Sequence, residues 1–244
     1  WMPQTNTEFV NSGTGYSVAC DSSGIMVAVG SGINTIIRST DGGITWNGLG
    51  NSIFTDFGYG IAVSSTGLWV AVGSGTNTMA YSNNGVDWTG LGKSIFNDYA
   101  YGSGGYGYGI AVDSSGLWVA VGSGLTNTIA YSYDGINWNG LGKNIFSEQG
   151  RSVSWNGSLW VAVGSGTNTI AYSNNGSDWT GLGKTIFDYS GYGVAWNGEK
   201  WVAVGEGTLN TFAYSNDGIT WTGIGNATFD FCGNSIAWNA GLGS

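Results

Sequence analysis

A single phrase recurs along this chain and constrains its fold more than any other feature. One copy reads Trp69-Val-Ala-Val-Gly-Ser-Gly-Thr-Asn-Thr-Met-Ala-Tyr-Ser82. The phrase begins again at Trp118, Trp160 and Trp201, with a weaker copy at Met26. A second phrase follows each copy, as in Ser39-Thr-Asp-Gly-Gly-Ile-Thr-Trp46, and its Trp recurs every 41 to 50 positions. Self-similarity at this period is typical of solenoids, propellers and repeat arrays.

Each unit reads as four short strands. Strand A is the Gly-Ile-Ala-Val type, strand B is Trp-Val-Ala-Val, strand C is Thr-Ile-Ala-Tyr-Ser, and strand D begins at the Trp after Asp-Gly or Asn-Gly. β-Branched and aromatic residues favour strands, and Asn-Gly or Asp-Gly favours a tight hairpin. No segment has helical periodicity of any length. The sequence therefore predicts an all-β chain, a β-propeller of four-stranded blades.

We expect one propeller domain over 1–244. Its repeats run at about 15–57, 58–104, 105–149, 150–190 and 191–233. Segment 1–9 keeps the Trp-to-Phe spacing of the other D strands, and segment 234–239 resembles a lone strand A. Five complete blades plus these two strands favour a ring of six blades, with a five-bladed ring as the alternative.

Composition excludes several classes of function. The net charge is −9, from 6 Lys and Arg against 15 Asp and Glu, so nucleic acids are not expected partners. No apolar run is long enough to span a bilayer. The chain has no His, which removes His-based triads and His-ligated zinc sites. We expect no cofactor and no metal. Cys20 and Cys232 lie near opposite ends, and whether they pair is open.

The second phrase resembles the Asp-box of the sialidase-type (BNR) repeat family. Ser39 to Trp46 matches Ser-x-Asp-x-Gly-x-Thr-Trp in full, whereas the other four copies are one residue shorter and two carry Asn84 or Asn175 for the Asp. The resemblance implies a propeller of such blades. Sialidases of that family hold the substrate carboxylate with three arginines, and this chain has only Arg38 and Arg151. We therefore expect a non-catalytic member and no enzyme activity.

Candidate ligand residues lie on one side of the predicted disc, where B–C loops and D-to-A linkers meet. Amide groups beside aromatic rings suit a neutral sugar. The candidates are Asn34, Asn77, Asn127, Asn168 and Asn210, with Tyr16, Tyr59, Tyr108 and Tyr192. The alternative is that the Asn side chains only bond loop backbone and the Tyr side chains only cap the core. Arg151 replaces the Tyr of the other linkers, and Glu206 replaces the Ser of the other B–C loops. These two differences mark either random sequence drift or a site that is unique to part of the ring.

The leading hypothesis is a non-catalytic binding or display module that recognises glycans, as a lectin does, or a protein surface through several like sites. A structural scaffold in a larger assembly is the second hypothesis, and a glycoside hydrolase the third. Few charges and many Gly, Ser, Asn and Thr residues suit an extracellular location or a virion or cell surface.

Overall fold

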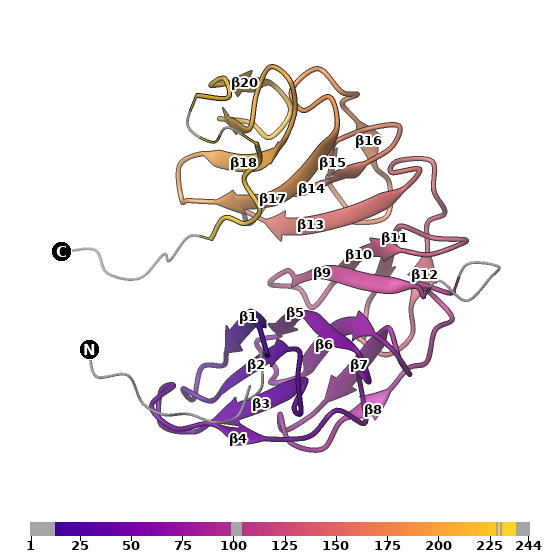
Figure 1. Cartoon of the computed structure of the whole chain (residues 1–244), viewed down its shortest axis with the longest axis vertical. Coiled ribbons are helices and arrows are strands. Elements are labelled where there is room, and N and C mark those ends of the chain that lie inside the picture. The colour runs from indigo at the N-terminus through magenta and orange to yellow at the C-terminus, as the bar shows by residue number, and fades with distance from the viewer. Residues whose placement is uncertain (1–12, 99–103, 228, 230, 238–244) are drawn as a thin grey trace.

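The computed structural model describes residues 13–98, 104–227, 229 and 231–237, and within them every regular element is a strand. Five four-stranded antiparallel units follow one another along the chain and stand side by side in an arc (Figure 1). A single residue pair, Ser165 with Ser190, joins the last two units into one sheet. The predicted all-β propeller fold is confirmed. No helix that could cross a membrane occurs in the described ranges.

Each blade is a meander whose strand A lies nearest the centre of the arc (Figure 1). The A strands are β1 (Gly15–Cys20), β5 (Phe57–Val63), β9 (Tyr106–Val112), β13 (Gln149–Trp155) and β17 (Ser190–Trp196). The B strands are β2 (Met26–Gly30), β6 (Trp69–Ser74), β10 (Trp118–Ser123), β14 (Trp160–Ser165) and β18 (Trp201–Glu206). The C strands are β3 (Ile36–Ser39), β7 (Met79–Ser82), β11 (Ile129–Ser132), β15 (Ile170–Ser173) and β19 (Phe212–Ser215).

The D strands are short and begin one residue later than predicted in four of the five blades. They are β4 (Asn47–Gly48), β8 (Thr89–Gly90), β12 (Asn139–Gly140), β16 (Thr180–Gly181) and β20 (Trp221–Gly223). The Trp before the strand belongs to the turn instead. In the blade of β12, for example, the Trp138 indole N–H donates to the Gly135 carbonyl at 3.0 Å.

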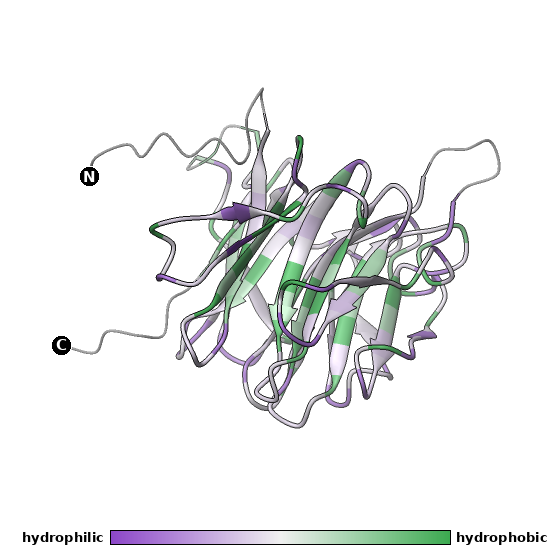
Figure 2. Cartoon of the chain, turned by 90° about the horizontal axis from the view of Figure 1, so that it is seen from below, coloured by the Kyte–Doolittle hydropathy of each residue, from purple (hydrophilic) through white to green (hydrophobic). Residues whose placement is uncertain are grey.

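The core lies between blades as well as within them. Trp160 of β14 is fully buried and packs in one cluster with Val119 and Val121 of the preceding blade and with Phe146 of the linker. Trp201 and Trp69 repeat this arrangement at their own blade boundaries. The strand B tryptophans are therefore wedges between blades, as predicted. Figure 2 shows the apolar residues gathered along the strands and polar residues mainly in the turns.

The C–D turns are closed by their own side chains. The Asp134 carboxylate accepts from the amides of Ile136 and Asn137 at 2.9 and 2.7 Å, and Asn84 does the same in its turn. Gly135 has φ +72°, and a Cβ there would lie 2.7 Å from Leu68 Cδ2 of the neighbouring blade. Glycine is required here both by the left-handed backbone and by the close packing.

After β20 the chain returns to the centre. The amide of Gly233 donates to the Gly205 carbonyl, and Cys232 pairs with Glu206 in an isolated bridge. Gly109 of β9 faces the next A strand, where a Cβ on it would lie 3.1 Å from Ser152 Cα. Gly193 of β17 faces the returning chain in the same way, because a Cβ on it would lie 3.2 Å from Ser235 Cα. Segment 234–237 thus occupies the position of a further A strand. Segments 1–9 and 238–239 lie outside the described residues, so the sixth blade stays a prediction. Cys20 and Cys232 are both free thiols.

Candidate functional site

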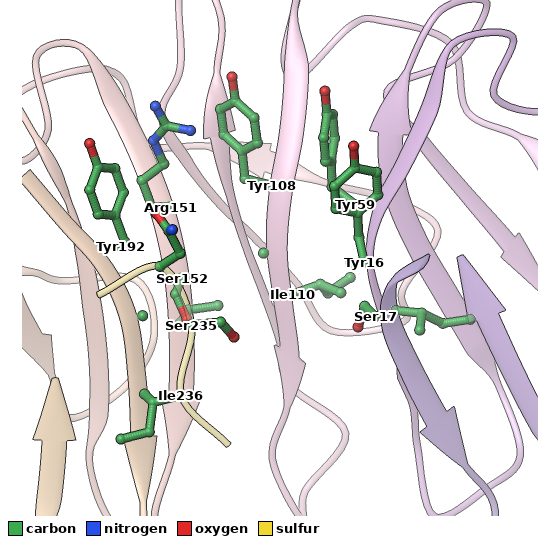
Figure 3. Close-up of a pocket in the computed structure, with 16 residues that line it drawn as sticks. Tyr16, Ser17, Tyr59, Tyr108, Ile110, Arg151, Ser152, Tyr192, Ser235 and Ile236 are labelled. Atoms are coloured by element: carbon green, nitrogen blue, oxygen red, sulfur yellow. The ribbon is translucent and has the colours of Figure 1, made fainter. Parts of the chain in front are cut away.

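A cavity of about 560 Å³ lies at the centre of the arc, between the A strands. All four predicted tyrosines, Tyr16, Tyr59, Tyr108 and Tyr192, line it, although each belongs to a different blade. Arg151 stands at the same repeat position in the remaining blade. We call these five side chains the tyrosine rim. Figure 3 shows them in a row, with the phenol oxygens and the guanidinium on one side of the cavity.

A backbone irregularity in each A strand accounts for this placement. The pairing between β5 and β6 shifts register between Gly58 and Gly60, and Tyr59 is the extra residue. Corresponding shifts occur in the other four A strands. Because a β-bulge re-aims the side chain of its extra residue, the bulges turn the rim side chains toward the axis. A Cβ on Gly60 would lie 2.9 Å from the Tyr108 carbonyl, so glycine allows neighbouring A strands to approach.

The rim forms a connected aromatic surface. The Tyr59 ring lies 5.3 Å from that of Tyr16 and 5.2 Å from that of Tyr108, between ring centroids. Phe57 stacks on Tyr59, and Tyr106 stacks on Tyr108, at 5.5 and 5.7 Å. Sequence reasoning missed this second row. The sequence pattern that could have revealed these two rings is an aromatic residue two positions before the rim tyrosine, because such residues share one face of a strand.

The polar end of the rim lies between the last two described blades. The Arg151 guanidinium lies over the Tyr108 ring at 4.7 Å and over the Tyr192 ring at 5.5 Å. The Tyr192 hydroxyl donates to Glu206 Oε2 at 2.6 Å. The two breaks in the repeat, Arg151 and Glu206, are therefore both in contact with one tyrosine. Neither position could be linked to the other from sequence spacing alone.

Burial controls the ionisation of the rim. Desolvation, together with the neighbouring Tyr108 and Tyr16 phenols, raises the pKa of Tyr59 to about 12. Desolvation and the hydrogen bond to Glu206 raise the pKa of Tyr192 to about 12. Both phenols therefore keep their protons near neutral pH, and the single hydroxyl proton of Tyr192 is donated to Glu206.

The five predicted asparagines lie away from the axial cavity, in contacts with loop backbone. Each accepts a hydrogen bond through Oδ1, at 2.8 or 2.9 Å, from the backbone amide of a glycine that follows strand D of its own blade. The pairs are Asn34 with Gly50, Asn77 with Gly92, Asn127 with Gly142, Asn168 with Gly183, and Asn210 with Gly225. Four of them also donate through Nδ2 to the carbonyl of a linker Ile, at 2.7 to 3.1 Å. These bonds hold each B–C loop against the linker, so a ligand would compete with them.

The chemistry available at the rim is stacking, hydrogen-bond donation and one positive charge. Among the described residues that line the cavity, none is Asp or Glu. No cluster of three or more His, Cys, Asp or Glu residues suited to a metal occurs in the described part of the chain.

Comparison with known proteins shows the fold. No protein-family model and no curated protein sequence matches the chain. Among solved structures, the GH74 enzyme of Niastella koreensis matches with a TM-score of 0.66 and 18% identity, over 86% of this chain and 38% of that one. The chain thus spans less than half of that enzyme.

Two further groups of structures match over most of their length. YCF48 from Cyanidioschyzon merolae has a TM-score of 0.61 and 16% identity, over 91% of this chain and 74% of that one. A nidogen/laminin complex has a TM-score of 0.60 and 15% identity, over 83% and 75%. A further structure is YCF48 bound to D1 peptide, with a TM-score of 0.57 and 16% identity, over 87% and 67%. The likeness establishes a propeller-like all-β fold for this chain, and at these identities it shows the fold alone.

Proposed function

We propose that this protein is a non-catalytic binding module that recognises a protein partner through the tyrosine rim. One observation carries the proposal. Four tyrosines from four blades, which stand far apart in sequence, line the same cavity at the centre of the arc. A core-capping role alone would not require the bulges that turn them there.

The chemistry of the rim favours a polypeptide ligand. Tyrosine presents a large, stiff, amphipathic surface at low entropic cost, and Ser and Gly beside it offer adaptable hydrogen bonds, as in antibody paratopes. Ser17, Ser152 and Ser235 line the cavity beside the rim. The fold neighbours support a binding role, because one of them is described as bound to a D1 peptide and another forms a nidogen/laminin complex.

Two features support a binding role over hydrolysis. A glycosidase needs two carboxyl groups facing one cleft, and the described lining of the cavity has none. Glu206, which lies beside the rim, accepts the hydroxyl proton of Tyr192 in a hydrogen bond. The fold neighbours include GH74 enzymes, so an assay for polysaccharide hydrolysis belongs in the test.

The geometry favours one convergent site over several like sites. The repeated asparagines bond the loops of their own blades, whereas the repeated tyrosines meet at one place. Glycan recognition by the same rings stays a prediction, since a ring face also stacks on a sugar. We also propose that the repeats are a divergent form of the Asp-box, on the evidence of the five self-closed turns.

The test measures binding of the purified chain to a random peptide array and to a glycan array. Tyr59→Ala and Tyr108→Ala remove rim rings, and Tyr133→Ala is the matched control because Tyr133 is 73% exposed in a C–D turn. A central aromatic anchor is worth ~2 kcal/mol or more, so each rim variant should weaken peptide binding about 30-fold or more, and the control should not. Peptide binding that survives both rim variants would contradict the proposal, as would glycan binding without peptide binding.

A further inference from the structure

Blade four differs from blades two and three at two positions that face the same side of strand A. In β5 and β9 the aromatic pairs Phe57 with Tyr59 and Tyr106 with Tyr108 occupy these positions, and in β13 they are Gln149 and Arg151. The substitution exchanges two stacked rings for one cation and one amide. It places polar groups where blades two and three carry aromatic rings.

Both new groups have unused hydrogen-bonding capacity. Arg151 Nε and Gln149 Oε1 are buried, and neither has a hydrogen-bond partner among the described residues. The ion pair found in the described ranges joins Lys93 and Asp98, so no described carboxylate lies within ion-pair distance of Arg151. Glu206 lies nearby, but it bonds the Tyr192 hydroxyl. Arg151 lines the cavity, so a ligand there can approach its guanidinium group.

The neighbouring rings orient the cation. The guanidinium lies against Tyr108 on one side and Tyr192 on the other, at 4.7 and 5.5 Å from their ring centroids. A planar fork held in this way presents parallel N–H donors, a geometry that matches a carboxylate and that lysine cannot reproduce. In Figure 3 the guanidinium nitrogens stand level with the phenol oxygens of the rim.

We propose that Arg151 recognises the terminal carboxylate of a polypeptide, whose last residues enter the cavity along the tyrosine rim. This inference rests on the proposed function and names its ligand class. A cavity of about 560 Å³ at the centre of the arc admits a chain end of a few residues. The net charge of −9 disfavours polyanions, so a ligand with a single carboxylate is the better match.

The experiment uses two arrays of the same random octapeptides, tethered through their N-termini. One array has free C-terminal carboxylates and the other has C-terminal amides. We expect binding to the free acids to exceed binding to the amides about 10- to 100-fold, as for loss of a charge-assisted bidentate contact. Equal binding to both arrays would overturn the inference.

Three variants assign the preference to Arg151. Arg151→Tyr installs the residue that the other four blades carry at this position, so the fold is expected to persist. It should bind both arrays equally, and Arg151→Lys should recover only part of the preference. Glu206→Ser restores the serine of the other B strands and should keep the preference. An acid preference unchanged in Arg151→Tyr would overturn the inference.

The outcomes separate this inference from the proposed function. Binding that is lost in Tyr59→Ala and Tyr108→Ala, but equal for acid and amide, leaves the rim as the site and refutes carboxylate recognition. Absence of binding on both arrays refutes both.

Discussion

Asn168→Ala tests whether the repeated asparagines hold the fold together. The side chain is 9% exposed, donates to the Ile145 carbonyl at 2.7 Å and accepts from the Gly183 amide at 2.8 Å. Alanine leaves both backbone groups without these partners. An unsatisfied buried group costs ~1–3 kcal/mol, so we expect a loss of about 2–4 kcal/mol in the free energy of unfolding.

Urea denaturation followed by tryptophan fluorescence measures this loss. Thermal unfolding gives a second measure. For a chain of this size a loss of ~1 kcal/mol in the free energy of unfolding lowers Tm by about 2–4 °C, which predicts a fall in Tm of roughly 4–16 °C. Asn174→Ala is the matched control, because Asn174 is exposed in the C–D turn of the same blade. Asn168→Asp should be at least as destabilising as Asn168→Ala, because it keeps the acceptor for Gly183 but puts a carboxylate oxygen against the Ile145 carbonyl. A loss within ~0.5 kcal/mol of the control would refute the reasoning.

Two other predictions concern the turns. Gly135→Ala should destabilise the protein by ~1–3 kcal/mol more than Gly142→Ala, because both have positive φ but only the first would clash with a neighbouring blade; equal urea midpoints would contradict this. The Thr45 hydroxyl and amide, with the Ser39 hydroxyl, lower the pKa of Asp41 to about 2 from 3.8. Because the folded-state pKa is depressed, this contribution is complete above the unfolded pKa and is lost as the pH falls from about 4 to 2. Asp41→Asn should flatten the decline in urea midpoint over that range, and an unchanged decline would count against the turn bonds.

The sequence was sufficient for the blades because each blade is a local unit. Strand order, the A–B and C–D turns and the side of the disc that carries the B–C loops all follow from contacts within about 40 residues. The wedge role of Trp69, Trp118, Trp160 and Trp201 was also predictable, since an all-apolar strand must be covered on both faces. The late start of most D strands was not predicted. Before β4, β12 and β16 the Trp completes the turn through its indole N–H instead.

The candidate site was predicted in part, for reasons that individual residues make clear. The repeat places one tyrosine at the same position of four A strands: Tyr16, Tyr59, Tyr108 and Tyr192. The bulges that turn these side chains inward were not predictable, because they depend on the hydrogen-bond register between strands, which the sequence does not reveal. The sequence could not show whether Asn168 binds a ligand or the backbone. Its partner, the Ile145 carbonyl, lies 23 residues away along the chain, and only the folded structure brings the two together. Contact of Arg151 and Glu206 with the same tyrosine is likewise a long-range property.

Binding stoichiometry tests the central claim, that the repeated tyrosines converge on one site. The measurement is isothermal titration calorimetry of the purified chain with the tightest peptide from the array. A convergent rim predicts one peptide per chain, with the heat abolished in Tyr108→Ala and retained in Tyr133→Ala. Several equivalent peptides per chain, unaffected by Tyr108→Ala, would contradict the account and point to separate sites on the individual blades.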